Sequence, residues 1–236
     1  MSFIQPTPTA PAAIPPQKLC VVFTDVIDST DQWNTNESAM WESIEIHHRI
    51  LRDRMAQYSG FEIKSLGDGF FIVFVDPRQA LHFCLVVQRE LAATQWPAAI
   101  VARRAIKDAT EGRKMDRHPR GLMIRMGLHW AQPFRTIHDQ VVMRADVYGV
   151  EICAAHRVQE QANGDEIAIS DTFLRELMKK SRKGEDPTTV LTNEIRAALI
   201  YRECSIGRYD FRYIGRPAMK GISEPEDVSI VTYKRR

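Results

Sequence analysis

The segment GFEIKSLGDGFFIVFV, residues 60–75, constrains the fold more than any other part of the chain. It contains two apolar stretches rich in β-branched and aromatic side chains, which is the composition of strands. Between them lie Gly67, Asp68 and Gly69, and this is the chemistry of a tight hairpin turn. The segment therefore predicts two antiparallel strands joined at Asp68.

The flanks of this hairpin predict the rest of a core. The apolar run LCVVFTD is typical of a buried strand, and the stretches before and after the hairpin have helical spacing. The order strand, helix, hairpin, helix, strand matches a ferredoxin-like β-α-β-β-α-β unit. The expected flanking elements are a strand over 19–25, helices over 37–59 and 77–95, and a strand over 121–131.

The second half of the chain predicts further helices and strands on this core. Ser170 is a suitable N-cap for the second helix of this half. We therefore expect an α+β fold, a ferredoxin-like βαββαβ core extended by further strands and helices. The additional elements are helices over 149–162 and 171–181 and strands over 166–170, 208–215 and 228–233.

The chain is expected to form one domain over 19–236, preceded by a proline-rich tail or linker over 1–18. Residues 98–120 are rich in charge and poor in periodicity, so we interpret them as a surface insertion whose first half is helical. Residues 183–205 are interpreted as a second, polar insertion.

Charge and cysteine content exclude several classes of protein. With 32 Lys and Arg against 30 Asp and Glu, the net charge of +2 gives no general electrostatic reason to expect nucleic acid or an anionic membrane as a partner. No stretch resembles a membrane span or a signal peptide. The cysteines form no C-x-x-C unit, so we expect a reduced, cytoplasmic chain, alone or as part of a larger or membrane-associated protein. They are Cys20, Cys84, Cys153 and Cys204.

Two carboxylates are candidates for metal binding. Asp25 ends the first strand and Asp68 lies in the hairpin turn. The first and third strands of a βαββ unit are neighbours, so these side chains can meet, and two carboxylates suit a hard cation such as Mg²⁺. The plainer interpretation is that Asp68 is a turn residue and Asp25 a helix cap, and the pattern alone favours it.

Six ordered sequence blocks favour metal binding over the plainer interpretation. Together they resemble the catalytic domain of class III nucleotidyl cyclases, most closely the fungal and trypanosomatid adenylyl cyclases. They cover nearly all of residues 19–233 in the expected order. The blocks are FTDVIDST, HHRILRDRM, GFEIKSLGDGFFIVF, IRMGLHWAQP, DVYGVEICAAHRVQE and MKGISEP.

The resemblance implies a role for the residues at matched positions. Asp25 and Asp68 match two metal-binding aspartates, Val26 matches a metal-contacting backbone carbonyl, and two Mg²⁺ or Mn²⁺ ions per site are implied. Lys64 and Asp146 match the pair that reads adenine. A lysine donates to adenine N1 and an aspartate accepts from the N6 amine, so the chemistry is complementary.

The same resemblance implies two cations for the phosphates. Arg157 matches the transition-state arginine and Lys220 the lysine that binds terminal phosphate. Both suit a transfer in which charge moves onto a leaving pyrophosphate. As single residues, Lys64, Asp146 and Arg157 would be read as solvated or turn residues.

The chain departs from the family pattern at one catalytic position. Cys153 stands four residues before Arg157, where the family has an asparagine that orients ribose and stabilises the transition state. A thiol is a weaker hydrogen-bonding group than an amide. Losing one oriented contact of this kind reduces a rate by about 10²–10³.

The resemblance implies an adenylyl cyclase that converts ATP to 3′,5′-cyclic AMP and pyrophosphate by attack of the ribose 3′-oxygen. In the family the metal aspartates come from one subunit, and the purine pair, Arg157 and Lys220 from the other. This chain has both sets, so a head-to-tail homodimer with two equivalent sites is implied.

Two alternatives remain open. Cys153 favours a weak or inactive nucleotide-binding domain that regulates or dimerises with a partner. A cyclase with altered base choice is the other alternative, and Lys64 with Asp146 argues against it.

Overall fold

A computed structural model of the chain describes residues 18–112, 121–132, 135–139, 144–181, 190–203 and 208–234. Nearly all of the expected proline-rich tail, the middle of each expected insertion and Cys204 lie outside these ranges. The expected division into tail, domain and insertions stays a prediction.

The helices and strands follow the predicted order. The first half contains β1 (Leu19–Val26), α1 (Ser29–Thr35), α2 (Glu37–Gln57), β2 (Phe61–Leu66), β3 (Gly69–Phe74), α3 (Pro77–Ala93) and α4 (Ala98–Thr110). The second half contains β4 (Ile124–Ala131), β5 (Arg135–Asp139), β6 (Arg144–Tyr148), α5 (Val150–Gln159), β7 (Glu166–Ser170), α6 (Asp171–Ser181), α7 (Asn193–Glu203), β8 (Arg208–Gly215) and β9 (Val228–Lys234).

The main sheet has seven strands in the order β2-β3-β1-β4-β7-β9-β8. Its first four strands are antiparallel neighbours, and β1 lies between β3 and β4. This is the strand order of a ferredoxin-like unit, so the predicted α+β core is confirmed. β7 joins β4 in parallel and is followed by the antiparallel strands β9 and β8, which extend the core as expected.

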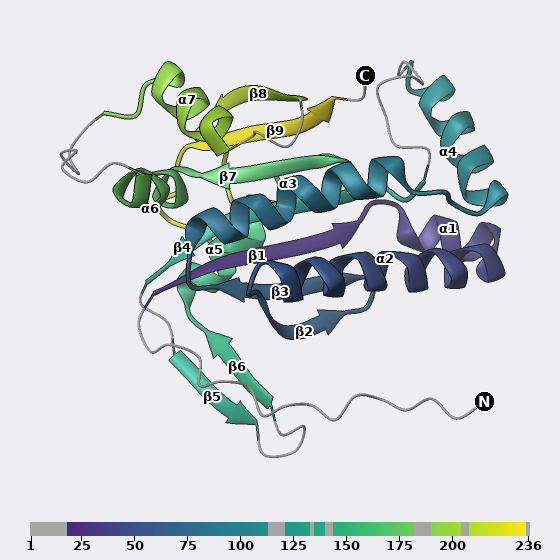
Figure 1. Cartoon of the computed structure of the whole chain (residues 1–236), viewed down its shortest axis with the longest axis horizontal. Coiled ribbons are helices and arrows are strands. Elements are labelled where there is room, and N and C mark those ends of the chain that lie inside the picture. Colours follow the sequence, from purple (N-terminus) through teal and green to yellow (C-terminus); the bar gives the residue numbers. More distant parts are fainter. Residues whose placement is uncertain are drawn as a thin grey trace.

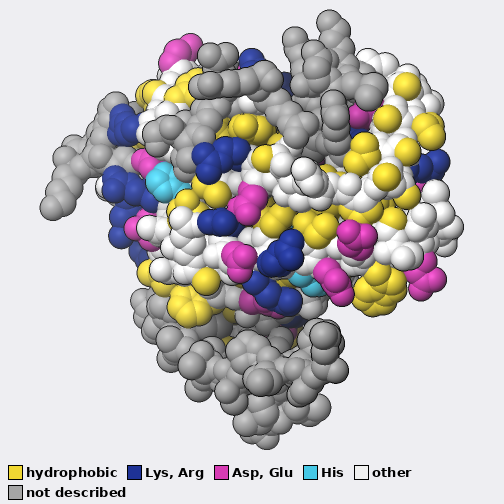
Figure 2. Space-filling model, turned by 45° about the vertical axis from the view of Figure 1, so that its right-hand side comes forward, with side chains coloured by type: hydrophobic (Ala, Val, Ile, Leu, Met, Phe, Trp, Pro, Cys, Tyr) yellow, Lys and Arg dark blue, Asp and Glu magenta, His cyan; other side chains and the backbone are white. Residues whose placement is uncertain are grey.

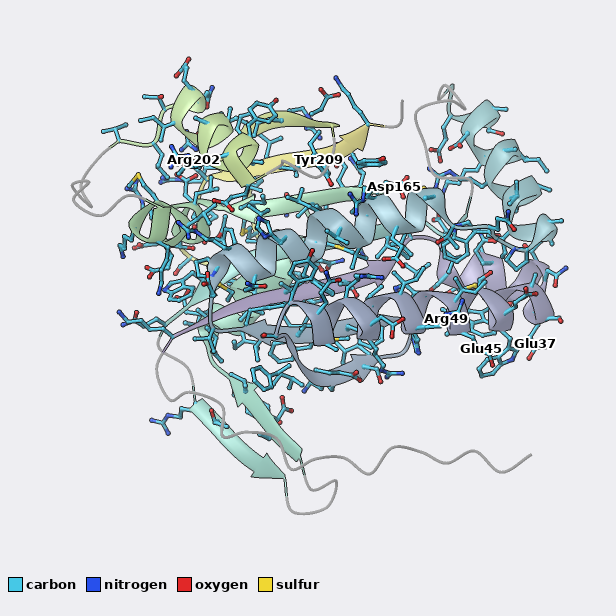
Figure 3. All side chains as sticks on the ribbon, viewed as in Figure 1. Glu37, Glu45, Arg49, Asp165, Arg202 and Tyr209 are labelled. Carbon is cyan, nitrogen blue, oxygen red and sulfur yellow. The ribbon has the colours of Figure 1, made fainter. Side chains whose placement is uncertain are left out.

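Helices cover both faces of this sheet. In Figure 1, α2 and α3 cross the front of the sheet and α5 lies behind it. Buried side chains of α2 and α3 form one large core with the front face, and those of α5 form smaller cores with the back face. Tyr209 of β8, labelled in Figure 3, donates a hydrogen bond of 2.9 Å to the carbonyl of Leu85 in α3, so the added strands are tied to the front layer.

Glycine allows α5 to approach the sheet closely. A Cβ on Gly127 of β4 would lie 2.4 Å from the Cα of Gln159, well inside any real contact distance. Only glycine therefore permits this packing without displacing α5. The position of α5 matters because it carries Cys153 and Arg157.

The structure differs from the sequence prediction in four places. A short helix, α1, lies between β1 and α2, and β5 pairs with β6 in a separate two-stranded hairpin that projects below the sheet in Figure 1. Neither was predicted, because both segments are short and polar. The helical start of 98–120 is confirmed as α4, but Arg104 and Asp108 are buried, so this segment is not purely superficial. In 183–205, α7 likewise buries Leu199 and Ile200.

The surface carries charges of both signs. Lys, Arg, Asp and Glu side chains are interspersed over the face seen in Figure 2, with no single-sign field on the coloured part of that face. Within the described ranges, none of the helices is long and apolar enough to cross a membrane.

Candidate functional site

Asp25 and Asp68 are brought together by the contact between β1 and the β2–β3 hairpin. Thr24 pairs with Phe70, and the Phe70 amide donates to the Thr24 hydroxyl at 3.0 Å. A Cβ on Gly69 would lie 2.3 Å from the Thr24 carbonyl oxygen, so only glycine lets the turn pass this close. The turn residue Asp68 is thereby held beside the end of β1.

Asp68 has features that suit a metal ligand. Its Oδ2 atom is buried and has no hydrogen-bond partner. Burial raises the pKa of Asp68, and repulsion from Asp25 adds to this, while a hydrogen bond with Ser29 opposes it. Two coupled carboxylates with an unpartnered buried oxygen fit a divalent cation. The described residues contain no cluster of three or more His, Cys, Asp or Glu suited to a metal, so further ligands would have to be backbone or nucleotide oxygens.

Val26 is the last residue of β1, directly after Asp25. Its side chain is buried and it pairs with Ile124 of β4. This packing fixes the backbone at the position where the sequence suggests a metal-contacting carbonyl.

The structure adds Arg125, which the sequence interpretation missed. Arg125 lies opposite Asp25 in the β1–β4 register, and its Nε and a terminal nitrogen donate to Asp25 Oδ2 at 2.9 and 2.6 Å. The strand register was the signal that could have identified it. The Arg125 guanidinium therefore lies against the negative charge of Asp25.

Lys64 and Asp146 meet as predicted. Lys64 Nζ lies 2.6 Å from Asp146 Oδ2 and bridges β2 to β6. Asp146 also accepts from the Tyr148 hydroxyl and the Val147 amide, both at 2.8 Å. Burial acts to raise the pKa of Asp146, but these donors, Lys64 foremost, more than offset it, so the pKa is lowered and the carboxylate stays ionised.

Arg157 and Lys220 are also neighbours. Arg157 Nε donates to the backbone carbonyl of Lys220 at 3.0 Å, and another guanidinium nitrogen lies 2.6 Å from Glu160 Oε1. Lys220 lies in a turn whose next residue, Gly221, has a φ of 77°, which favours glycine. Two segments distant in sequence are therefore in direct contact at Arg157 and the Lys220 backbone.

Cys153 lies on α5, one turn before Arg157, and is an exposed free thiol. Residues four apart lie on the same helix face, so the two side chains share a surface. The ring of His156, on the same helix, packs edge-on against Phe23 with centroids 5.4 Å apart.

These groups share one face of the sheet. Asp25 follows Phe23 by two residues, so their side chains point to the same side. Phe23 and Phe71 belong to the core beneath α5, and Lys64 Nζ lies 6.0 Å from the Phe71 ring centroid.

The residues nevertheless form three separate clusters. The clusters are Asp25 with Asp68 and Arg125, Lys64 with Asp146, and Arg157 with Lys220. In the part of the chain that the structure describes, no hydrogen bond or ion pair links one cluster to another.

The chain is similar to a known family of domains over most of its length. Residues 13–195 match the family model described as "Adenylate and Guanylate cyclase catalytic domain". The chain is 30% identical over 226 residues to an adenylate cyclase of Neurospora crassa, covering 91% of this chain and 10% of the relative. It is also 30% identical over 246 residues to an adenylate cyclase of Schizosaccharomyces pombe, covering 98% of this chain and 14% of the relative. The chain thus spans only a small part of these relatives.

Solved structures share the fold. An adenylate cyclase from Trypanosoma brucei, analysed in its monomeric state, superposes with a TM-score of 0.70 at 22% identity. The match covers 94% of this chain and 93% of that structure. At this level of identity the likeness establishes the architecture of the domain.

Proposed function

The chain belongs to the family of adenylate and guanylate cyclase catalytic domains, and we propose that it is an adenylyl cyclase. It converts ATP to 3′,5′-cyclic AMP and pyrophosphate. The ribose 3′-oxygen bonds to the α-phosphorus, the bond from that phosphorus to the bridging oxygen of the β-phosphate breaks, and the 3′-hydroxyl proton goes to solvent.

The observation that carries this proposal is the contact of 2.6 Å between Lys64 and Asp146. These residues present a donor and an acceptor side by side, as adenine N1 and the N6 amine require. Guanine offers a donor at N1 and an acceptor at O6, so the same pair would oppose it. Tyr148 and the Val147 amide hold Asp146 in place, which fixes the acceptor before the base binds.

Asp25, Asp68 and the Val26 carbonyl would hold two Mg²⁺ or Mn²⁺ ions. The unpartnered Oδ2 of Asp68 supports this assignment. The ions supply charge neutralisation and a lowered pKa for the 3′-hydroxyl. None of the described side chains is placed as a dedicated base, and Asp25 is the residue nearest to that role.

Three cations of the chain suit the triphosphate. Arg157 and Lys220 stabilise the charge that develops on pyrophosphate. Arg125 is paired with Asp25 at 2.6 Å, and a cation bound by Asp25 would compete for that carboxylate. The guanidinium released by that competition can bind a phosphate oxygen bidentately.

The active site is shared between two copies of the chain in a head-to-tail homodimer. The support is the division of the site residues into clusters without a direct contact between them. Each chain has both the metal cluster and the purine and phosphate clusters, so a two-fold pair completes two sites. Exposed apolar side chains beside the purine pair, Tyr148 and Val150 among them, provide surface for such contact.

Product analysis tests the proposal. Purified chain is incubated with ATP or GTP and Mn²⁺, and cyclic nucleotides are separated and quantified. Cyclic AMP from ATP and little product from GTP is the expected result. ATP binding without turnover would instead support a nucleotide-binding regulatory domain, for which exposed Cys153 at the asparagine position is the favouring observation. Equal products from both nucleotides would refute the role given to Lys64 and Asp146.

A further inference from the structure

His129 is a buried histidine of β4 whose two ring nitrogens both face acidic side chains. It is 1% exposed. Nε2 lies 2.9 Å from Glu151 Oε2, and Nδ1 lies 2.9 Å from Glu226 Oε1. Nδ1 also lies 3.0 Å from the Ser170 hydroxyl and 3.3 Å from that of Thr172. Carboxylates on both nitrogens require both to donate, so this ring is the imidazolium cation.

The two carboxylates belong to segments that carry the phosphate cations. Glu151 lies in the first turn of α5, the helix of Arg157. Glu226 lies near the end of the loop over 216–227, which contains Lys220. Glu226 is itself fixed, because it accepts from the Thr172 amide at 2.7 Å at the start of α6.

α5 and this loop are therefore joined at two points. At one end, Arg157 Nε donates to the Lys220 carbonyl at 3.0 Å. At the other end, His129 lies between Glu151 and Glu226. These contacts form a closed path. It runs from His129 along α5 to Arg157, from there to Lys220, and back along the loop to His129.

We propose that protonated His129 is a positioning residue that, by holding Glu151 and Glu226, sets where Arg157 and Lys220 meet the phosphates of the nucleotide. This inference rests on the proposed function for its effect on catalysis. The clamp itself, His129 between α5 and the loop, is a property of the fold and can be measured without turnover.

The surroundings keep the clamp charged at neutral pH. Glu151 and Glu226 are the titratable groups that face the ring, since β1 contributes apolar Val21 and β7 and α6 contribute hydroxyls. Burial acts to lower the pKa of His129, but the two carboxylates outweigh it and raise the pKa to about 9. The clamp is therefore complete at neutral pH and is lost as the pH rises through 9.

Replacing the ring tests the clamp. His129→Gln removes the charge and leaves an amide of similar reach. His82→Gln is the matched control, because His82 forms a 3.0 Å pair with Glu203 on the other face of the sheet. Amide hydrogen exchange is measured on both variants and on wild type. We expect faster exchange over both 150–157 and 216–227 in His129→Gln, with the α2 and α3 amides unchanged, and neither change in the control.

Kinetics separate positioning from a merely stabilising role. We expect His129→Gln to lower kcat for ATP by about 10²-fold, as for a small displacement of charged groups. The preference for ATP over GTP should not change, because Lys64 and Asp146 do not belong to the closed path of contacts. We also expect the kcat of wild type to fall as the pH rises above about 9, and the variant to lack this fall.

Several outcomes would overturn the clamp. One is that His129→Gln folds but the amides of 150–157, of 216–227 or of both exchange at the wild-type rate. Another is that kcat falls while amide exchange in these segments does not change. If wild type makes no cyclic nucleotide, the proposed function fails and the exchange data still decide on the clamp. If His129→Gln does not fold, the protection of the same amides is compared in two other ways. One uses Glu226→Gln, which keeps the side-chain shape, and the other uses wild type at pH 8 and at pH 10. Unchanged protection of both segments in these would equally exclude the clamp.

Discussion

At the scale of single residues, the ionised carboxylate of Asp68 destabilises the folded chain unless a cation binds it. Burial and the nearby Asp25 raise the pKa of Asp68, so the folded chain holds this proton more tightly than the unfolded chain does. Without metal, the free energy of unfolding therefore falls as pH rises through the window between the unfolded and folded pKa values. A bound divalent cation reverses this effect.

The variant Asp68→Asn should separate the two effects. It removes the charge of a half-buried carboxylate whose Oδ2 has no hydrogen-bond partner, so the melting temperature of the metal-free chain at pH 7 should not fall and is expected to rise. Mn²⁺ should no longer raise that temperature, and cyclase activity should drop by about 10²-fold or more. Exposed Asp53→Asn is the control. A variant that Mn²⁺ still stabilises as much as wild type would show that Asp68 is not a ligand.

Cys153 stands where the sequence analysis expects the asparagine of the family pattern. We expect Cys153→Asn to raise kcat, by up to about 10²-fold, because an amide can orient the ribose where a thiol cannot. Cys153→Ala is the control for loss of the thiol alone. Initial rates with ATP and Mn²⁺ decide the matter, and a slower Cys153→Asn enzyme would show that this position does not face the ribose.

At the scale of elements, the proposed recognition of adenine depends on the contact of Lys64 in β2 with Asp146 in the β5–β6 hairpin. Lys64→Ala should remove most of the discrimination between ATP and GTP, because one of two base-reading groups is lost. Its effect on unfolding should stay below about 1 kcal/mol, since the side chain is partly exposed. Arg52→Ala is a matched control, as Arg52 forms a comparable surface pair with Glu62 of β2 at 2.9 Å. Equal loss of discrimination in both variants would contradict the assignment.

The elements also show what the sequence could predict. Asp25 and Asp68 were predicted to meet because a βαββ unit makes its first and third strands neighbours, and no other topology was needed. The pairing of Lys64 with Asp146 and the roles of Arg157 and Lys220 came from the family resemblance, whereas the contact between Arg157 and Lys220 was found only in the structure. Periodicity alone would have left these residues on the surface. Short segments such as α1 and β5–β6 have too few apolar residues to show a period. Arg125 and His129 depend on strand register and burial, which one sequence does not reveal.

At the scale of the whole molecule, α4 is connected by ion pairs to the core and to the segment after β1. Arg104 of α4 forms a buried pair with Asp165, labelled in Figure 3, at 2.9 Å. Lys107 and Arg103 of α4 pair with Asp28 and Asp31, which follow the Asp25 end of β1. A partner that moved α4 would therefore reach the site through α1.

The central claim is a cyclase site assembled from two copies of the chain, and mixing two inactive variants tests it most directly. Asp25→Ala lacks the metal cluster and Arg157→Ala lacks a phosphate cation, so each alone should be nearly inactive. A mixed dimer retains one intact site, and an equimolar mixture should recover up to about a quarter of wild-type cyclic AMP formation if subunits pair at random. Two folded, inactive parents whose mixture, after subunit exchange, makes no cyclic AMP would contradict the shared site.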